Sequence, residues 1–343
     1  MENWIVEFGI YAMEFGTQLL DGGSRLFVGY LVASLVAAML IYRHRKVAGG
    51  LREFLFPRSV WDHPDAWLDV RYFAFHGLIG HFVMRGLVVA ALVAGLTFTS
   101  GGAIDPSDIP TGNAFGTGTS FVLAAALYLG LVVVGDFAAF VMHLLQHRIP
   151  LLWQFHKVHH SGEVMHPLSN FREHPVDNIA YKLLQGFVHG AALGACFAIL
   201  GIVPGTPLVF GIAVASLVFN SVAYSLRHSH IWLRWPGRWS MVYGSPAHHQ
   251  VHHSRHPDHL DTNFAFQFPI WDVIFGTYCM PEDNRDVEFG IVEDASELDS
   301  CVNLYVVPFR HAWQVLTGRR PAYGEKPVEP DFLEACNGGV TPR

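Results

Sequence analysis

The sequence has little charge, and the charge it has is not basic. Only 15% of the 343 residues are charged and the formal net charge is −7, whereas about 25% of an ordinary globular chain is charged. Lysine and arginine are scattered and form no basic stripe of the kind that binds nucleic acid. We therefore exclude a nucleic-acid-binding protein. The hydrophobic fraction of 51% indicates a membrane protein instead.

Cysteine pairs and nucleotide-binding motifs are also missing. The four cysteines stand at positions 196, 279, 301 and 336, so no two have the spacing of a metal or iron–sulfur site. We interpret them as unpaired thiols in a reducing compartment. The chain lacks a GxGxxG motif after a strand and a CxxC motif, so it offers no reductase of its own. Any redox reaction would need a separate electron donor.

Long apolar segments are present, and they predict the fold class. A helix needs about 20 predominantly apolar residues to cross the hydrocarbon core of a membrane. We predict an all-α, polytopic membrane helix bundle of four to five spans, with a helical cytoplasmic cap. The candidate spans are 26–42, 78–98, 121–142, 184–203 and 207–223.

The basic residues predict the orientation of these spans, because lysine and arginine in short loops stay in the cytoplasm. With five spans, all lysines and arginines except Arg25 and Arg85 lie on one side of the membrane. The loop 99–120, on the other side, contains no lysine or arginine. This pattern places the N-terminus outside and the C-terminus in the cytoplasm. The first 25 residues lack a basic start and a small-residue cleavage site, so we interpret them as an interfacial helix rather than a signal peptide.

Histidine is abundant, and it is patterned. HKVHH at 156–160 repeats as HQVHH at 249–253, and HLLQH at 143–147 continues the third span. Helical spacing lets imidazoles of one box point the same way, and the predicted topology brings eight of them to the cytoplasmic face. Imidazole suits Zn, Cu, Fe and Ni; we favour iron, with two ions. The eight candidate ligands are His143, His147, His156, His159, His160, His249, His252 and His253.

One carboxylate lies inside a predicted span. Asp136 precedes His143 by two helical turns, so both residues share a helix face. A charge inside a span is costly and is usually functional. We predict that Asp136 accepts the N–H of a ligating imidazole; the alternative is a charge satisfied by water near the end of the span.

Two stretches resemble a known family. DFAAFVMHLLQHRIPLLWQFHKVHHSGE at 136–163 and SPAHHQVHHSRHPDHLDTNFAFQFPIWDVIFGT at 245–277 resemble the fatty acid hydroxylase superfamily, also called the sterol desaturase family. HxxxH, HxxHH and HxxHH boxes in this order mark that family. The resemblance covers residues 120–282 approximately.

The resemblance implies a membrane-embedded di-iron oxygenase that uses O2 and two external electrons to hydroxylate a fatty acyl chain, a sterol or a related lipid. It implies that the eight box histidines are ligands of two iron ions. His174 in REHP and His228 in LRHSH match weaker family features and are added as metal ligands. The electron donor would be a ferredoxin or a cytochrome b5-like carrier.

Three alternatives stay open. A desaturase would use the same site, and sequence does not distinguish the two outcomes. A metal-dependent hydrolase would need a general base such as the Glu of HExxH, and no box contains one. A metal transporter would place its ionisable residues along a path through the membrane rather than at one face.

We predict one fold unit with three parts. Residues 1–118 hold the interfacial helix and the first two spans, and 119–282 form the histidine-box core. Residues 283–343 form a cytoplasmic tail. The histidine boxes lie on both sides of the fourth and fifth spans, so the core must fold as a whole.

Overall fold

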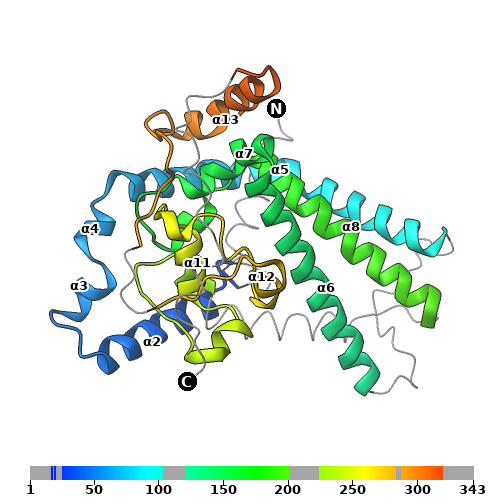
Figure 1. Ribbon diagram of the computed structural model, residues 1–343, viewed down its shortest axis with the longest axis horizontal. Coiled ribbons are helices and arrows are strands. Elements are labelled where there is room, and N and C mark those ends of the chain that lie inside the picture. Colours follow the sequence, from blue (N-terminus) through cyan, green and yellow to red (C-terminus); the bar gives the residue numbers. More distant parts are fainter. Residues whose placement is uncertain are drawn as a thin grey trace.

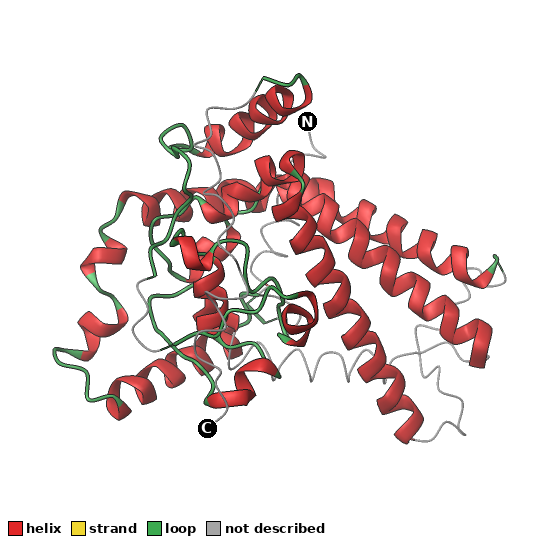
Figure 2. Ribbon diagram, in the orientation of Figure 1, coloured by secondary structure: helices red, strands yellow, loops and turns green. Residues whose placement is uncertain are grey.

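The computed structural model describes residues 17, 19–20, 25–102, 121–200, 224–282 and 287–319. Within these ranges the backbone forms helices and loops and no strand, apart from one isolated bridge between Ser254 and Phe289 (Figure 2). The predicted all-α fold is therefore confirmed for the described part of the chain.

Three long helices dominate one side of the molecule (Figure 1). They are α5 (Pro64–Ser100), α6 (Phe121–Arg148) and α8 (Pro175–Leu200). Helices α5 and α8 touch through glycine: a Cβ on Gly190 would lie 2.1 Å from the carbonyl oxygen of Leu92. Small residues of this kind let two helix backbones approach closely, as membrane helices commonly do.

Among the described residues, two helices are long and apolar enough to cross a membrane, Leu129–Arg148 and Pro175–Ile199. Shorter apolar helices cover Val28–His44 and Val89–Ser100. Core helices of soluble proteins pass the same test of length and composition, so two such helices are weak evidence of a membrane. The number of spans and the cytoplasmic cap stay predictions.

Four of the five predicted spans coincide with described helices. The segment 26–42 lies largely in α2 (Val28–His44), and 78–98 lies within α5. The segment 121–142 begins α6, and α8 contains 184–203 up to Leu200. The fifth segment, 207–223, lies outside the described residues.

A proline-directed turn folds the chain back at the end of α6. Pro150 is the first residue of α7 (Pro150–His160), and the preceding Ile149 is extended, with φ −93° and ψ 113°. Proline disfavours the helical conformation in the residue before it and suits the first position of a new helix. Helix α6 therefore ends at Arg148, and α7 turns back against it.

Short elements complete the fold around α7 (Figure 1). A buried apolar cluster joins α5, α7 and α13 through Tyr72, Val158 and Leu304. The remaining elements are α3 (Leu51–Leu55), α4 (Arg58–Trp61), η2 (Pro167–Phe171), α10 (Ser225–Arg227), η4 (Gly237–Met241), α11 (Pro246–His252), η5 (Pro257–His259), α12 (Ile270–Phe275) and α13 (Cys301–Leu316). The predicted division at 118/119 and 282/283 stays a prediction.

Candidate metal centre

Nine histidines gather in two groups where α6, α7, α10 and α11 meet. In each group, one ring nitrogen from every member lies within 4.8 Å of those of all the others. The first histidine group consists of His143, His147, His156, His160 and His252. The second histidine group consists of His159, His228, His249 and His253.

Each of the two HxxHH boxes divides its histidines between the two groups, whereas His143 and His147 both join the first group. In the box 156–160, the histidines at i and i+4 join the first group and His159, at i+3, joins the second. In the box 249–253 the assignment is reversed, because the i and i+4 histidines join the second group and His252 joins the first. A helix turns about 100° per residue, so i+3 and i+4 lie on opposite sides of i. We expected the imidazoles of one box to point the same way; instead, each HxxHH box serves both groups.

Backbone carbonyls orient two rings of the first group. The Nδ1 of His143 lies 2.7 Å from the carbonyl oxygen of Phe264, and the Nδ1 of His252 lies 2.8 Å from that of Thr262. A carbonyl only accepts, so we assign the proton to Nδ1 in both rings. Their Nε2 atoms then carry a lone pair, which is the form that binds a metal.

Carboxylates orient two further rings of the first group. The Nδ1 of His156 lies 3.0 Å from Asp177 Oδ2, and the Nδ1 of His147 lies 3.4 Å from Asp261 Oδ1. Gln146 donates to the other oxygen of Asp177. A carboxylate that accepts from the far nitrogen of an imidazole fixes the ring and raises its basicity as a ligand.

The loop 261–264 supplies three of these four contacts, and its backbone is unusual. Asp261 and Asn263 both have φ of 57°, a conformation that non-glycine residues seldom adopt. Asn263 is held there by two hydrogen bonds of 2.8 Å with the backbone of Cys279. Such a conformation persists only where its surroundings impose it, and here it aims the loop at the first group.

Neutral acceptors orient the rings of the second group. The Nδ1 of His159 lies 3.2 Å from the carbonyl oxygen of Arg172, and the Nδ1 of His228 lies 3.0 Å from Ser169 Oγ. The Ser169 hydroxyl donates its proton to the carbonyl oxygen of His166 at 2.9 Å. It can therefore only accept from His228, whose Nε2 is left with a lone pair.

The Nε2 atoms face one another. In the first group, His160 Nε2 lies 3.2 Å from the Nε2 of both His147 and His156. In the second, His249 Nε2 lies 2.8 Å from that of His228. With Nδ1 protonated in most of these rings, too few protons remain to join these nitrogens by hydrogen bonds. Lone pairs packed this closely fit a cation between them.

An unsatisfied nitrogen leads to the same conclusion. Among the described residues, the buried Nε2 of His252 has no hydrogen-bond partner. A buried polar atom without a partner is costly, and a role in binding an ion is one of the ordinary explanations for such an atom. The nitrogens present therefore fit metal ions, with imidazole as the ligand.

Burial keeps these imidazoles neutral. It lowers the pKa of His159 to about 4 and that of His252 to about 3, and it lowers the pKa of His160 and His253 well below the usual range. Neighbouring imidazoles add to the effect, because a second positive charge would be repelled. At neutral pH these four rings are unprotonated and ready to bind metal.

A buried ion-pair network supports the second group from α5. Asp69 accepts from Arg172 Nε and lies 3.0 Å from His166 Nε2, and all three side chains are buried. The pKa of Arg172 is raised, because Asp69 and Asp65 outweigh the effect of burial. Since Arg172 and Ser169 supply the acceptors for His159 and His228, Asp69 holds the segment that orients them.

Nine of the ten histidines predicted as ligands are brought together, and His174 is not. His174 Nδ1 accepts from the backbone N–H of Val176 at 3.1 Å, and its Nε2 lies 3.0 Å from the carbonyl oxygen of Tyr305. Both nitrogens are thus used at the start of α8. That the other nine bind metal stays a prediction.

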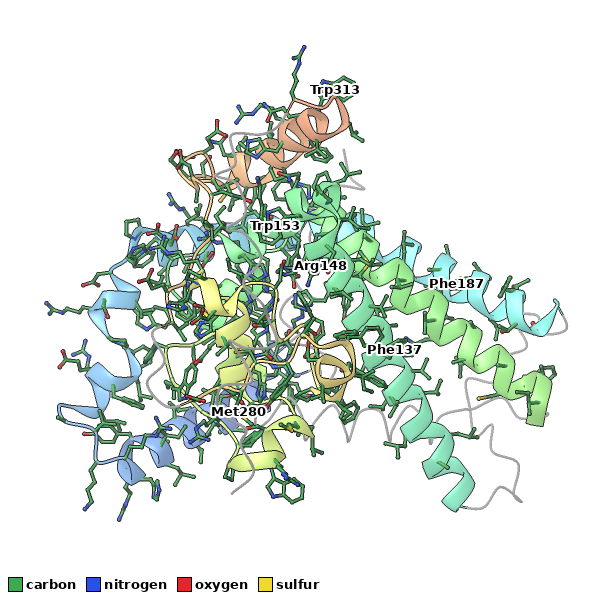
Figure 3. All side chains as sticks on the ribbon, in the orientation of Figure 1. Phe137, Arg148, Trp153, Phe187, Met280 and Trp313 are labelled. Carbon is green, nitrogen blue, oxygen red and sulfur yellow. The ribbon has the colours of Figure 1, made fainter. Side chains whose placement is uncertain are left out.

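Asp136 contacts the backbone near α12 rather than an imidazole. It accepts from the N–H groups of Gln267 and Phe268, at 2.9 and 3.1 Å, and from Trp271 Nε1 at 3.0 Å. The ring of the neighbouring Phe137, which Figure 3 labels on α6, packs on that of Trp271 with ring centroids 4.9 Å apart. Asp136 therefore anchors the chain just after the loop 261–264.

The residues that orient the imidazoles were not predicted from the sequence. Asp177 begins α8, Asp261 lies in a loop, and Ser169 lies in η2. None of the three has a fixed spacing from the histidine that it contacts. The only sequence signal was that Asp177 and Asp261 each lie close to a histidine-rich segment.

A family model described as fatty acid hydroxylase matches residues 128–277, which is less than half of the chain. The match contains all three histidine boxes and His228. The predicted resemblance to the fatty acid hydroxylase superfamily is confirmed by this match and by the relatives described next.

Curated relatives agree with the family match. Alkylglycerol monooxygenase of Caenorhabditis elegans is 25% identical over 183 residues, 53% of this chain and 32% of the relative. Ornithine lipid hydroxylase OlsE of Rhizobium tropici is 25% identical over 207 residues, 60% of this chain and 56% of the relative. Human cholesterol 25-hydroxylase is 34% identical over 145 residues, 41% of this chain and 47% of the relative. The chain thus spans a third to just over half of these relatives, and no solved structure matches it significantly.

Proposed function

Because residues 128–277 match the fatty acid hydroxylase family, we propose that the protein is an integral-membrane oxygenase that hydroxylates a lipid. The proposed reaction converts a C–H bond of the lipid into C–OH. It consumes one O2, two electrons and two protons, and the second oxygen atom leaves as water. The relatives named above are a monooxygenase and two hydroxylases, which supports a hydroxylation.

The observation that carries the proposal is the pair of buried histidine groups. Each offers four or five imidazoles whose ring nitrogens converge, so we propose one ion in each group. An all-imidazole site suits several transition metals, and we propose iron because hydroxylation needs a redox-active metal. When bound, iron would supply the reduction of O2, which amino-acid side chains do not carry out.

The protein's own residues would orient the imidazole rings, shield the centre from bulk water and position the lipid. The acceptors on Nδ1 fix six of the nine rings so that Nε2 points inward, and burial excludes bulk water. An apolar groove of about 510 Å³ between α6 and α8 offers a place for the hydrocarbon part of a lipid. Leu131 and Val134 of α6 line it together with Phe187 of α8, and Figure 3 labels Phe187.

We propose that the electrons come from a separate carrier, a ferredoxin or a cytochrome b5-like protein. We also propose that the metal centre faces the cytoplasm, with the N-terminus outside, because nearly all lysines and arginines lie on one side of the predicted spans. An epitope inserted in loop 99–120 should then be accessible to antibody on intact cells. Access only after permeabilisation would contradict this orientation.

Lipid mass spectrometry tests the proposed function. Cells that express the wild type should contain a lipid heavier by one oxygen atom that is missing from cells expressing His252→Ala. The matched control is His256→Ala, because His256 lies just beyond the box, partly exposed, and caps η5. A product lighter by two hydrogens would indicate a desaturase instead. Identical lipids in wild type and His252→Ala would overturn the oxygenase proposal.

A further inference from the structure

A cavity of about 200 Å³ touches both histidine groups, and its other walls are polar. It reaches His143 and His156 of the first group and His159 and His249 of the second, and Phe266 is the one apolar residue among those that line it. The polar groups that matter for its chemistry belong to Arg25, Asn170, Glu173, Tyr181, Tyr224 and Arg227.

The cavity presents charges of both signs. Arg25 Nη1 lies 2.8 Å from Glu173 Oε1. Burial alone would raise the pKa of Glu173, but Arg25 and nearby histidines hold it at about 2, so both partners are ionised. Arg227 adds a second cation, buried beside the rings of Tyr224 and Phe266.

The cavity also offers neutral hydrogen-bonding groups. Asn170 Nδ2 donates to the Tyr224 hydroxyl at 2.9 Å. The hydroxyl of Tyr181, which lines the same cavity, has no hydrogen-bond partner within the described part of the chain. A hydrocarbon chain in this space would displace water from all these groups and return no hydrogen bond, at a cost for each group.

We propose that the substrate places a polar headgroup in this cavity, so that the carbon oxidised lies in the head or within a few bonds of it. The inference rests on the proposed function, because it concerns which part of the lipid meets the histidines. Walls of both signs and the tyrosine hydroxyls select a head that both donates and accepts hydrogen bonds. A lipid whose far hydrocarbon end is oxidised would have to bring that end into the polar cavity.

The position of the apolar groove supports the same orientation of the lipid, with its headgroup at the histidines. Helix α6 ends and α8 begins at the metal centre, so the residues that line the groove lie farther along both helices, away from the histidines (Figure 1). Between the groove and the cavity, Gln185 Nε2 donates to the carbonyl oxygen of Gly135 at 2.9 Å. Apolar walls far from the histidines and polar walls beside them match an amphiphile bound with its head at the centre.

Tandem mass spectrometry of the new lipid tests the inference. The product present with the wild type and missing with His252→Ala is fragmented to locate its added oxygen. We expect the oxygen on the headgroup or on the first few carbons next to it. An oxygen in the middle or at the far end of the hydrocarbon overturns the inference and leaves the oxygenase intact. If no product forms, the proposed function fails and the inference fails with it.

A single hydroxyl provides the second test. Tyr181→Phe removes a hydrogen-bonding group from the cavity wall and keeps the ring, which packs on Phe266. With the lipid identified above, KM should rise roughly 2- to 12-fold with kcat nearly unchanged, as expected for one lost hydrogen bond. Tyr42→Phe is the matched control, because the Tyr42 hydroxyl bonds Gly49 on the exposed surface. An unchanged KM in Tyr181→Phe would mean that the cavity holds only solvent, which overturns the inference.

Discussion

The two histidine groups share one ligand type and differ in what holds the ligands. In the first, carboxylates lie against Nδ1 of His147 and His156, and carbonyls lie against two more rings. In the second, the contacts described for His159 and His228 go to a carbonyl and a hydroxyl. A carboxylate partner makes an imidazole a stronger ligand. The same residue type can therefore build two sites of unequal affinity.

The groups also draw their support from different parts of the chain. The first is oriented by Asp177 and by the loop 261–264, all within the family match. The second depends through Arg172 and Ser169 on Asp69, which precedes the matched residues. We expect the first group to keep its metal ion longer than the second. The first prediction below tests whether metal stabilises the centre at all, and the two after it test this order.

The largest effect should follow removal of metal from both groups. Converging lone pairs that lose their cation repel one another, so we expect a strong iron chelator to cost about 4 kcal/mol or more of folding stability. Thermal unfolding in detergent, with and without chelator, measures the change, and added iron should restore it. A melting temperature that does not respond to chelator would show that the histidines are stable without metal.

Asp69→Asn should weaken metal binding by the second histidine group and leave metal binding by the first group unchanged. The change leaves the buried Arg172 without its nearest carboxylate, which costs about 3 kcal/mol. Metal analysis during a chelator titration should show one ion released early and one retained. Asp65→Asn is the matched control, because Asp65 is more exposed and 3.4 Å from Arg172, and should cost less than about 1 kcal/mol. Equal early loss of both ions in Asp69→Asn would contradict the separate support of the two groups.

Asp177→Asn should weaken metal binding in the first group and leave metal binding in the second group unchanged. Its effect on folding stability should be smaller than that of Asp69→Asn. Loss of the carboxylate that contacts His156 should lower the affinity of the first group for its metal ion about 10- to 100-fold. Ser169→Ala is the corresponding change in the second group. It should lower the affinity of that group for its metal ion only about 2- to 12-fold, since a neutral hydrogen bond is lost. Chelator competition measures both. A larger loss from Ser169→Ala than from Asp177→Asn would invert the comparison.

The ligands could be predicted from sequence because their spacing is local. Four residues on a helix place His143 and His147 on one face, and the same rule applies within each box. What spacing did not show is that each HxxHH box serves two groups, which depends on how α7 and α11 face each other. His174 carries a family-like signal, yet both its nitrogens are used at the start of α8.

The supporting residues could not be predicted, because their contacts join distant segments. Asp177 and Asp261 meet their histidines only after α8 and the loop 261–264 have folded against α6 and α7. Asp136 could be singled out as a costly charge inside a span, but its partner could not. The helical fold class followed from long apolar segments, whereas the membrane topology depends on segments such as 207–223 that lie outside the described residues.

The long separation of the contacts around the centre has a consequence for the unfolded chain. The hydrogen bond between His143 and Phe264 joins residues 121 positions apart, and the stacked rings of His160 and His253 lie 4.2 Å apart. An ion bound by both boxes would act as a cross-link. Closing a loop of about 100 residues in this way removes about 5 kcal/mol of chain entropy from the unfolded state, as a disulfide would. The metal content of a preparation would then report the fraction of chains that reached the native topology.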